Sequence, residues 1–200
     1  MNALRLILAS ASPRRSELLR KLDIPFTVHV SNTPEFSSQH SHLTPREICL
    51  ANANAKARAV AREYPDSLVL GADTEVALGN RVFGKPRSKR QAAAFLRDLS
   101  GHTHQVITGV CLLCLQHRFR RSFTETTHVT FHPLSNRDIA RYLDAVHALD
   151  KAGAYAIQEH GAWIIEHLEG SLSNVVGLPL AALQRALDPL PKTWNIHRPR

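Results

Sequence analysis

The chain is 200 residues long and 44% hydrophobic, which is enough for one domain with its own core and without disulfides. A formal net charge of +8 favours anionic partners but does not choose between nucleic acid, a lipid surface and small phosphorylated molecules. Three cysteines do not make a disulfide framework and favour a cytoplasmic protein, and the N-terminal apolar run is too short for a signal segment or membrane span. We therefore expect one domain over residues 1–190, a basic tail over residues 191–200 and no contact with membranes.

Hydrophobic periodicity and helix-start signals predict alternating strands and helices in the first part of the chain. The expected order is strand 4–9, helix 13–22, strand 26–30 and helix 45–63. The last of these helices starts with a capping box from Thr44 to Glu47 and has proline at its first position. Residues 67–71 are apolar like a buried strand, and we expect that strand to end at residues 72–74.

Hairpins predominate further along the chain. A Gly79-Asn80 turn separates two short strands, and residues 105–115 and 119–131 are predicted to form a long antiparallel pair. The remaining expected elements are helices 88–99, 135–146 and 180–187 and strands 163–168 and 172–176. Together these patterns predict a mixed α/β fold in which helices cover a mixed sheet.

The turn after the first strand is the first candidate for function. Ser12 and Pro13 are typical of a helix N-terminus, and Arg14 and Arg15 follow in the first helical turn, where the helix dipole disfavours positive charge. A phosphate would be bound well here by backbone N–H groups, the hydroxyls of Ser10 and Ser12 and two guanidinium groups. A solvated arginine pair beside an ordinary helix cap explains the same pattern equally well.

Four further charged residues are candidates of lower specificity. Asp73 follows a buried strand, where open α/β sheets bind ligands, and a turn-forming aspartate is the alternative. Lys85 lies between glycine and proline, which fix an irregular backbone that can direct its ammonium toward a ligand. Taken alone, Glu35 in a polar loop and Lys56 on an alanine-rich helix are explained better as solvated side chains.

Residues 150–158 form a glycine- and alanine-rich segment that is long for a connector. Its small residues allow a ligand to approach closely, so we favour a binding loop that ends at Gln158, with a mobile surface loop as the alternative.

Cys111 and Cys114 have a spacing found in zinc sites. Residues three apart on a strand face opposite ways, so we assign no zinc.

Six motifs follow one another along the chain: Ser10 to Arg15, the helix bearing Lys56, Gly71 to Thr74, Gly84-Lys85-Pro86, Asp150 to Gln158, and Gly170 to Pro179. Each motif is weak alone, but the ordered set covers about residues 4–187 and resembles the Maf family of nucleoside triphosphate pyrophosphatases. The resemblance implies the Maf and Ham1 (ITPase-like) fold, an elongated mixed sheet flanked by helices with a central cleft.

The resemblance also implies an activity, the hydrolysis of dTTP, UTP and modified pyrimidine nucleotides to the monophosphate and pyrophosphate. In that comparison Asp73 is the proton acceptor that activates water. The implied phosphate-binding residues are Ser10, Ser12, Arg14, Arg15, Lys56 and Lys85. The residues that resemble the branch acting on dTTP and UTP, rather than the branch acting on 7-methyl-GTP, are Arg14, Thr74 and Gln158.

The implied cofactor is a divalent metal cation, Mg²⁺ or Mn²⁺, because developing phosphoryl charge calls for positioned cations. Such an ion prefers carboxylate oxygens, so Glu35 and Asp73 are its candidate ligands. The two roles of Asp73 compete, since a carboxylate that binds a metal is a poorer base. The sequence departs from the family at Pro34, where many relatives have an acid, and at Glu75, where an apolar residue is usual.

The expected partners are the nucleoside triphosphate substrate and, as the family implies, a second copy of the chain in a homodimer. A competing hypothesis is a catalytically weak nucleic-acid-binding or division-regulating protein on the same fold, motivated by the charge of +8. Aromatic residues make up only 6% of the chain and form no stacking array, so we expect no nucleic-acid partner.

Overall fold

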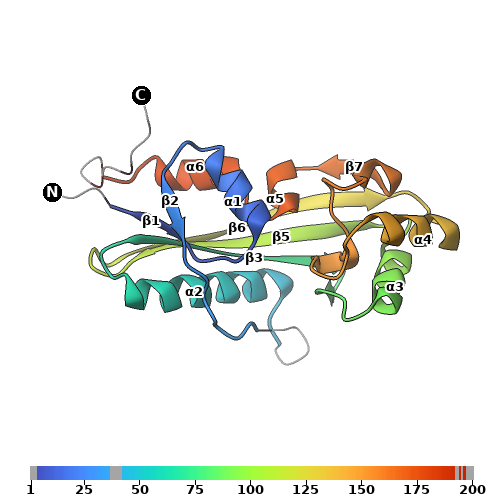
Figure 1. Cartoon of the computed structure of the whole chain (residues 1–200), viewed down its shortest axis with the longest axis horizontal. Coiled ribbons are helices and arrows are strands. Elements are labelled where there is room, and N and C mark those ends of the chain that lie inside the picture. The colour runs from blue at the N-terminus through green and yellow to red at the C-terminus, as the bar shows by residue number, and fades with distance from the viewer. Residues whose placement is uncertain (1–3, 37–41, 192–193, 195, 197–200) are drawn as a thin grey trace. The chain divides into compact units, whose positions relative to one another are not determined.

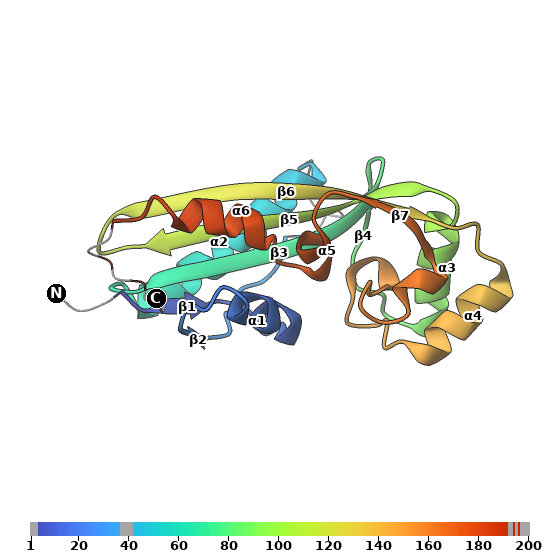
Figure 2. The same cartoon turned by 90° about the horizontal axis from the view of Figure 1, so that it is seen from above.

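The computed structural model describes residues 4–36, 42–191, 194 and 196, so most of the expected basic tail lies outside the described residues. In this part of the chain seven strands form one mixed sheet, in the order β2-β1-β3-β5-β6-β7 with β4 paired to β3 (Figures 1 and 2). The strands are β1 (Leu6–Leu8), β2 (Phe26–Val28), β3 (Leu68–Leu78), β4 (Arg81–Phe83), β5 (Thr103–Cys114), β6 (Phe119–Phe131) and β7 (Ile165–Glu169).

Helices accompany these strands in the described part of the chain, and the predicted mixed α/β class is confirmed. They are α1 (Pro13–Arg20), α2 (Pro45–Glu63), α3 (Lys89–Leu99), α4 (Asn136–Ala145), α5 (Leu172–Val176) and α6 (Leu180–Leu187). Short 3-10 turns, η2 (Ala152–Ala154) and η3 (Gly161–Trp163), lie between α4 and β7. None of the described helices is both long and apolar enough to span a bilayer.

Strand β1 pairs in parallel with both of its neighbours, whereas β4 and β7 pair antiparallel with β3 and β6. Leu6 of β1 lies opposite Phe26 of β2 and Leu68 of β3 in parallel register. Strand β4 returns antiparallel along β3, and β7 runs antiparallel to β6 with an irregularity after Thr130. All three residues of β1 are buried, which explains why this strand is apolar throughout rather than alternating.

Local capping signals predicted the helix starts correctly. The side chains of Ser12, Thr44, Ser88 and Ser135 each accept a hydrogen bond from a backbone N–H in the first turn of α1, α2, α3 and α4. The capping box at Thr44 is complete, because Glu47 accepts the backbone N–H of Thr44 in return, at 2.8 Å. The long pair of strands around residue 117 and the helix at 180–187 are also confirmed.

Two predictions of secondary structure were wrong. Residues 172–176 form helix α5 and not a strand, because Ser171 Oγ accepts the N–H of Asn174 at 3.2 Å and starts a helical turn. Strand β3 does not end at residues 72–74 but continues to Leu78. Asp73 therefore lies inside a strand, and its side chain is bound by groups from α2 rather than by a turn.

The chain folds as two compact units, and each has its own core. The first unit comprises Met1–Asp73, Thr108–Glu125 and Gly177–Arg200. Within this unit α2 runs along one face of the sheet, and α1 and α6 lie on the other face (Figures 1 and 2). Its core includes Ala53 and Ala57 of α2 packed against Val69 of β3.

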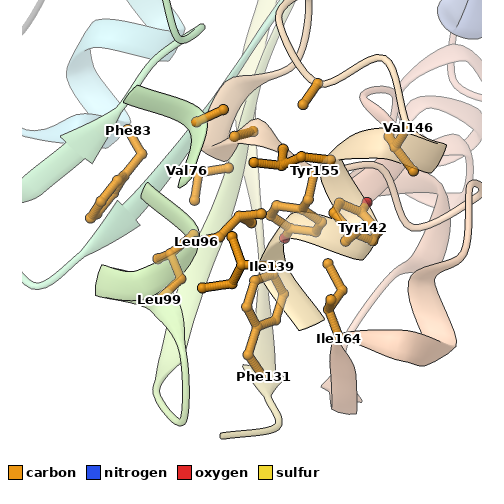
Figure 3. Packing of buried hydrophobic residues seen from close by; sticks show 14 of the residues in the cluster. Val76, Phe83, Leu96, Leu99, Phe131, Ile139, Tyr142, Val146, Tyr155 and Ile164 are labelled. Carbon is orange, nitrogen blue, oxygen red and sulfur yellow. The ribbon is translucent and has the colours of Figure 1, made fainter. Parts of the chain in front are cut away.

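The second unit comprises Thr74–Ile107 and Thr126–Val176. Its core gathers aliphatic and aromatic side chains from β3, β4, β6, α3 and α4, and Figure 3 shows Val76, Phe83, Leu96, Phe131 and Tyr142 among them. The ring of Tyr155 adds to this cluster, with its centroid 4.9 Å from that of Phe131 in an edge-to-face arrangement.

Candidate functional site

Helix α2 and strand β3 lie unusually close together in the first unit, and a glycine makes this possible. A Cβ atom at Gly71 would overlap the carbonyl oxygen of Ala53 and lie 2.9 Å from the nitrogen of Ala57. Side chains alternate along a strand, so Asp73 projects from the same face of β3 as Gly71, toward α2. On α2, Asn52 and Lys56 are one helical turn apart and share a face.

This packing brings a lysine into contact with two carboxylates. Lys56 Nζ lies 2.7 Å from Asp73 Oδ1 and 2.6 Å from Glu35 Oε1. The Lys56 side chain is only 12% exposed, so solvation does not account for it. The second oxygen of Asp73 accepts a hydrogen bond from Asn52 Nδ2 at 2.9 Å, and Asp73 is itself 6% exposed. Asp73 is thus a buried carboxylate held by one charged and one neutral donor.

The turn from β1 to α1 belongs to the same unit. Arg15 Nη1 donates to Ser10 Oγ at 3.1 Å, and Arg15 Nε donates to the carbonyl of Gly177 at 2.9 Å. Ser12 caps α1 by accepting the N–H of Arg15 at 3.4 Å, whereas Arg14 is half-buried. Burial lowers the pKa of Arg15, and the nearby carboxylates of Asp73 and Glu35 oppose that shift. Arg15 therefore belongs to the electrostatic surroundings of these two carboxylates.

Three predicted site residues, Thr74, Lys85 and Gln158, belong to the second unit. Thr74 is half-buried, and Lys85 and Gln158 are exposed. The loop bearing Lys85 is tied to the start of the glycine-rich segment, because Gly153 N donates to the carbonyl of Gly84 at 3.3 Å.

The glycine-rich segment of the second unit is anchored at both ends. Lys151 is buried, and its Nζ lies 2.9 Å from Asp150 Oδ1 and 3.3 Å from Glu159 Oε1. In the middle, the hydroxyl of Tyr155 lies 2.9 Å from Nε2 of buried His104. These contacts place Gln158 directly before a residue that is fixed by an ion pair, and they do not fit a loose surface loop.

Sequence reasoning missed Asn52. It is 1% exposed and contacts Asp73 directly, yet it is not among the residues that the sequence pattern of the alanine-rich helix indicates. A usable signal was present, because an amide side chain four residues before Lys56 lies on the same helical face as that lysine.

The donor set around Lys56 fits the divalent ion that the resemblance implies. Glu35 and Asp73 direct carboxylate oxygens to one shared cationic atom, and such hard oxygen donors are those that Mg²⁺ and Mn²⁺ prefer. Within the described residues no three His, Cys, Asp or Glu side chains are grouped closely enough to hold a metal ion. Mg²⁺ commonly uses one or two carboxylates and completes its shell with substrate phosphates and water, so two carboxylates suffice.

The geometry defines a class of protein. A mixed α/β sheet that carries paired carboxylates, a largely buried lysine and a partly buried arginine has the groups that phosphoanhydride chemistry uses. Comparison with known proteins agrees, because the family model described as Maf-like protein matches residues 5–190. The chain belongs to the Maf-like protein family, which confirms the resemblance found in its motifs.

Curated relatives cover nearly the whole chain. A dTTP/UTP pyrophosphatase of Akkermansia muciniphila is 46% identical over 92% of this chain and 95% of its own length. A dTTP/UTP pyrophosphatase of Bacillus velezensis is also 46% identical, over 96% of this chain and 97% of its own length. Among solved structures, the Staphylococcus aureus Ham1 protein matches with a TM-score of 0.47 and 17% identity, over 92% of this chain and 98% of that one.

Proposed function

We propose that this chain is a nucleoside triphosphate pyrophosphatase that hydrolyses dTTP, UTP and modified pyrimidine nucleotides to the monophosphate and pyrophosphate. Relatives with that name, 46% identical over nearly the full length, support the substrate class. The observation that carries the proposal is Lys56 Nζ, which lies within 2.7 Å of an oxygen of Asp73 and 2.6 Å of an oxygen of Glu35.

The cationic side chains bind the triphosphate in this proposal. Arg15 has a planar, five-donor group that suits phosphate oxygens, and burial makes each of its charge interactions stronger than it would be in water. Lys56 supplies a second positive charge next to the reacting groups. The remaining proposed phosphate-binding residues are Ser10, Ser12, Arg14 and Lys85.

Asp73 is the proposed proton acceptor. It takes a proton from a water molecule, the water oxygen forms a bond to phosphorus, and the α–β phosphoanhydride bond breaks as pyrophosphate leaves. The bonds from Asn52 and Lys56 fix the carboxylate plane before substrate arrives, so little reorganisation is needed during the reaction. A divalent metal held by Glu35 and Asp73 would supply charge stabilisation to the phosphate oxygens.

Selection of the base is assigned to Arg14, Thr74 and Gln158. The exposed amide of Gln158 offers one acceptor and two donors, which match the carbonyl and N–H edge of uracil and thymine. The ion pair between Lys151 and Glu159 supports this role because it limits the movement of the neighbouring Gln158.

We further propose a cytoplasmic homodimer. The cytoplasmic location is supported by the three cysteines, which are buried free thiols, and burial raises the pKa of Cys111 and so lowers its reactivity. The dimer follows from the family resemblance. Light scattering coupled to size exclusion will measure the mass of the particle, and a mass of about 22.3 kDa, that of one chain, would contradict the dimer.

Pyrophosphate release from dTTP, UTP, CTP, GTP and 7-methyl-GTP, with Mg²⁺ or Mn²⁺, tests the activity. We expect turnover of dTTP and UTP to exceed that of the other three nucleotides. The absence of turnover of every nucleotide by the pure protein would exclude an enzyme, and binding of single-stranded nucleic acid would then favour the competing hypothesis. Preference for 7-methyl-GTP would place the chain in the other branch of the family.

A further inference from the structure

The amide of Asn52 connects two parts of the site that are distant in sequence. Asn52 Oδ1 accepts the backbone N–H of Phe36 at 2.7 Å, and Asn52 Nδ2 donates to the carbonyl of Phe36 at 3.1 Å. The same Nδ2 donates its other hydrogen to Asp73 Oδ2 at 2.9 Å. One buried side chain on α2 therefore binds both the backbone next to Glu35 and the carboxylate of Asp73.

These three bonds allow only one orientation of the amide. Asp73 Oδ2 and the Phe36 carbonyl both require a donor, and the Phe36 N–H requires an acceptor, so a flipped amide would break all three bonds. Asn52 is 1% exposed, so water cannot readily replace a lost partner.

The described part of the segment that contains Glu35 is irregular and partly exposed. Glu35 and Phe36 lie outside regular secondary structure, and their side chains are about half exposed, at 52% for both. The bond pair from Asn52 resembles the pairing of two strands and fixes the backbone beside Glu35. Glu35 then lies where Lys56 Nζ reaches it, one helical turn from Asn52.

We propose that Asn52 is a positioning residue that holds the carboxylates of Glu35 and Asp73 within bonding distance of Lys56 Nζ. It acts through the two carboxylates and does not touch the substrate, and this role rests on the proposed pyrophosphatase function. Because Asn52 supplies one of the two donors to Asp73, its loss frees the carboxylate plane to rotate.

Hydrogen exchange of the Phe36 amide, measured by NMR on metal-free protein, tests the positioning without any turnover. In Asn52→Ala the exchange is expected to be at least about tenfold faster, because the partly buried hydrogen bond from the Phe36 N–H to Asn52 is lost. Asn52→Asp keeps an acceptor for the Phe36 N–H but, when ionised, has no donor for Asp73 or for the Phe36 carbonyl. In that variant we expect the Phe36 amide to stay protected while kcat for dTTP falls roughly 10- to 100-fold with a KM within threefold of wild type.

Asn54→Ala is the matched control. Asn54 lies on the same helix, bonds to the carbonyl of Leu50 at 2.6 Å and to Ser122 Oγ at 3.0 Å, and should affect neither the exchange rate nor kcat. Thermal melting of each variant checks that it is folded. Unchanged Phe36 exchange in Asn52→Ala, or a wild-type kcat in Asn52→Asp, would overturn the proposal. An inactive wild type whose Phe36 exchange still depends on Asn52 would instead overturn the pyrophosphatase function and leave the positioning contact intact.

Discussion

Replacing Gly71 by alanine should both destabilise the first unit and damage the site. The added methyl group collides with backbone atoms of Ala53 and Ala57, and backbone in the middle of a helix cannot turn aside as a flexible side chain would. Restoring normal contact requires α2 and β3 to separate by about 1 Å. Overpacking of this kind costs about 3 kcal/mol, the upper end of the usual range, because nothing nearby can rotate away.

The loss of stability converts into a measurable shift of the melting temperature. For a chain of this size about 3 kcal/mol corresponds to a decrease of roughly 6–12 °C. The hydrogen bonds of Asp73 to Lys56 and Asn52, at 2.7 and 2.9 Å, would lengthen beyond bonding range if α2 moved by that amount. We therefore expect kcat/KM for dTTP to fall by about 100-fold, as misplacement by 1 Å commonly does.

Gly84→Ala is the control for this experiment. A Cβ atom at Gly84 meets no atom within 4 Å, so its free energy of unfolding should change by less than about 0.5 kcal/mol. Differential scanning calorimetry gives the melting temperatures, and pyrophosphate release gives the rates. The reasoning is refuted if Gly71→Ala melts within 1 °C of Gly84→Ala, on the order of experimental error.

Three other measurements address the site and the second unit. Asp73→Asn should lower kcat by at least about 100-fold while triphosphate binding measured by calorimetry is retained, and a near-normal rate would exclude Asp73 as the base. Gln158→Ala should change the ratio of kcat/KM between dTTP and CTP by roughly tenfold, and a uniform loss across nucleotides would contradict a role in selecting the base. Burial lowers the pKa of His104 from 6.5 to about 4, so the unfolded chain binds a proton more readily than the folded chain between these values. The free energy of unfolding should therefore fall by up to about 3 kcal/mol as the pH falls from 6.5 to 4. Urea unfolding of His104→Gln at several pH values should show no such pH dependence. If the variant keeps the pH dependence of the wild type, other groups cause it.

The features that the sequence predicted correctly depend on neighbours in the chain. Thr44 and Ser135 start helices through bonds to residues three positions later, so their signals are complete within four residues. The strand predicted at residues 172–176 was wrong, although this stretch contains two valines, which are common in strands. The cap from Ser171 and the burial of Asn174, whose Nδ2 donates to the carbonyl of Val106 at 3.0 Å, stabilise the helix instead.

The features that local patterns do not predict, although the family resemblance named the residues, depend on contacts between distant parts of the chain. Asp73 continues a strand because Asn52 and Lys56 satisfy its oxygens, and no local pattern around residue 73 contains that information. Glu35 and Lys56 looked like solvated charges when each was considered with its own neighbours. Only the close approach of α2 to β3 at Gly71 makes them partners in one cluster.

Lys56 contacts the carboxylates of Glu35 and Asp73, and Arg15 interacts electrostatically with the same two carboxylates. Lys56 is therefore an internal counter-ion shared by the two carboxylates. In the proposed function a triphosphate would engage the lysine and arginine charges, and the carboxylates would then favour a new cation. Under that proposal, binding of nucleotide and binding of divalent metal would be thermodynamically linked, so that each would raise the affinity for the other by the same factor.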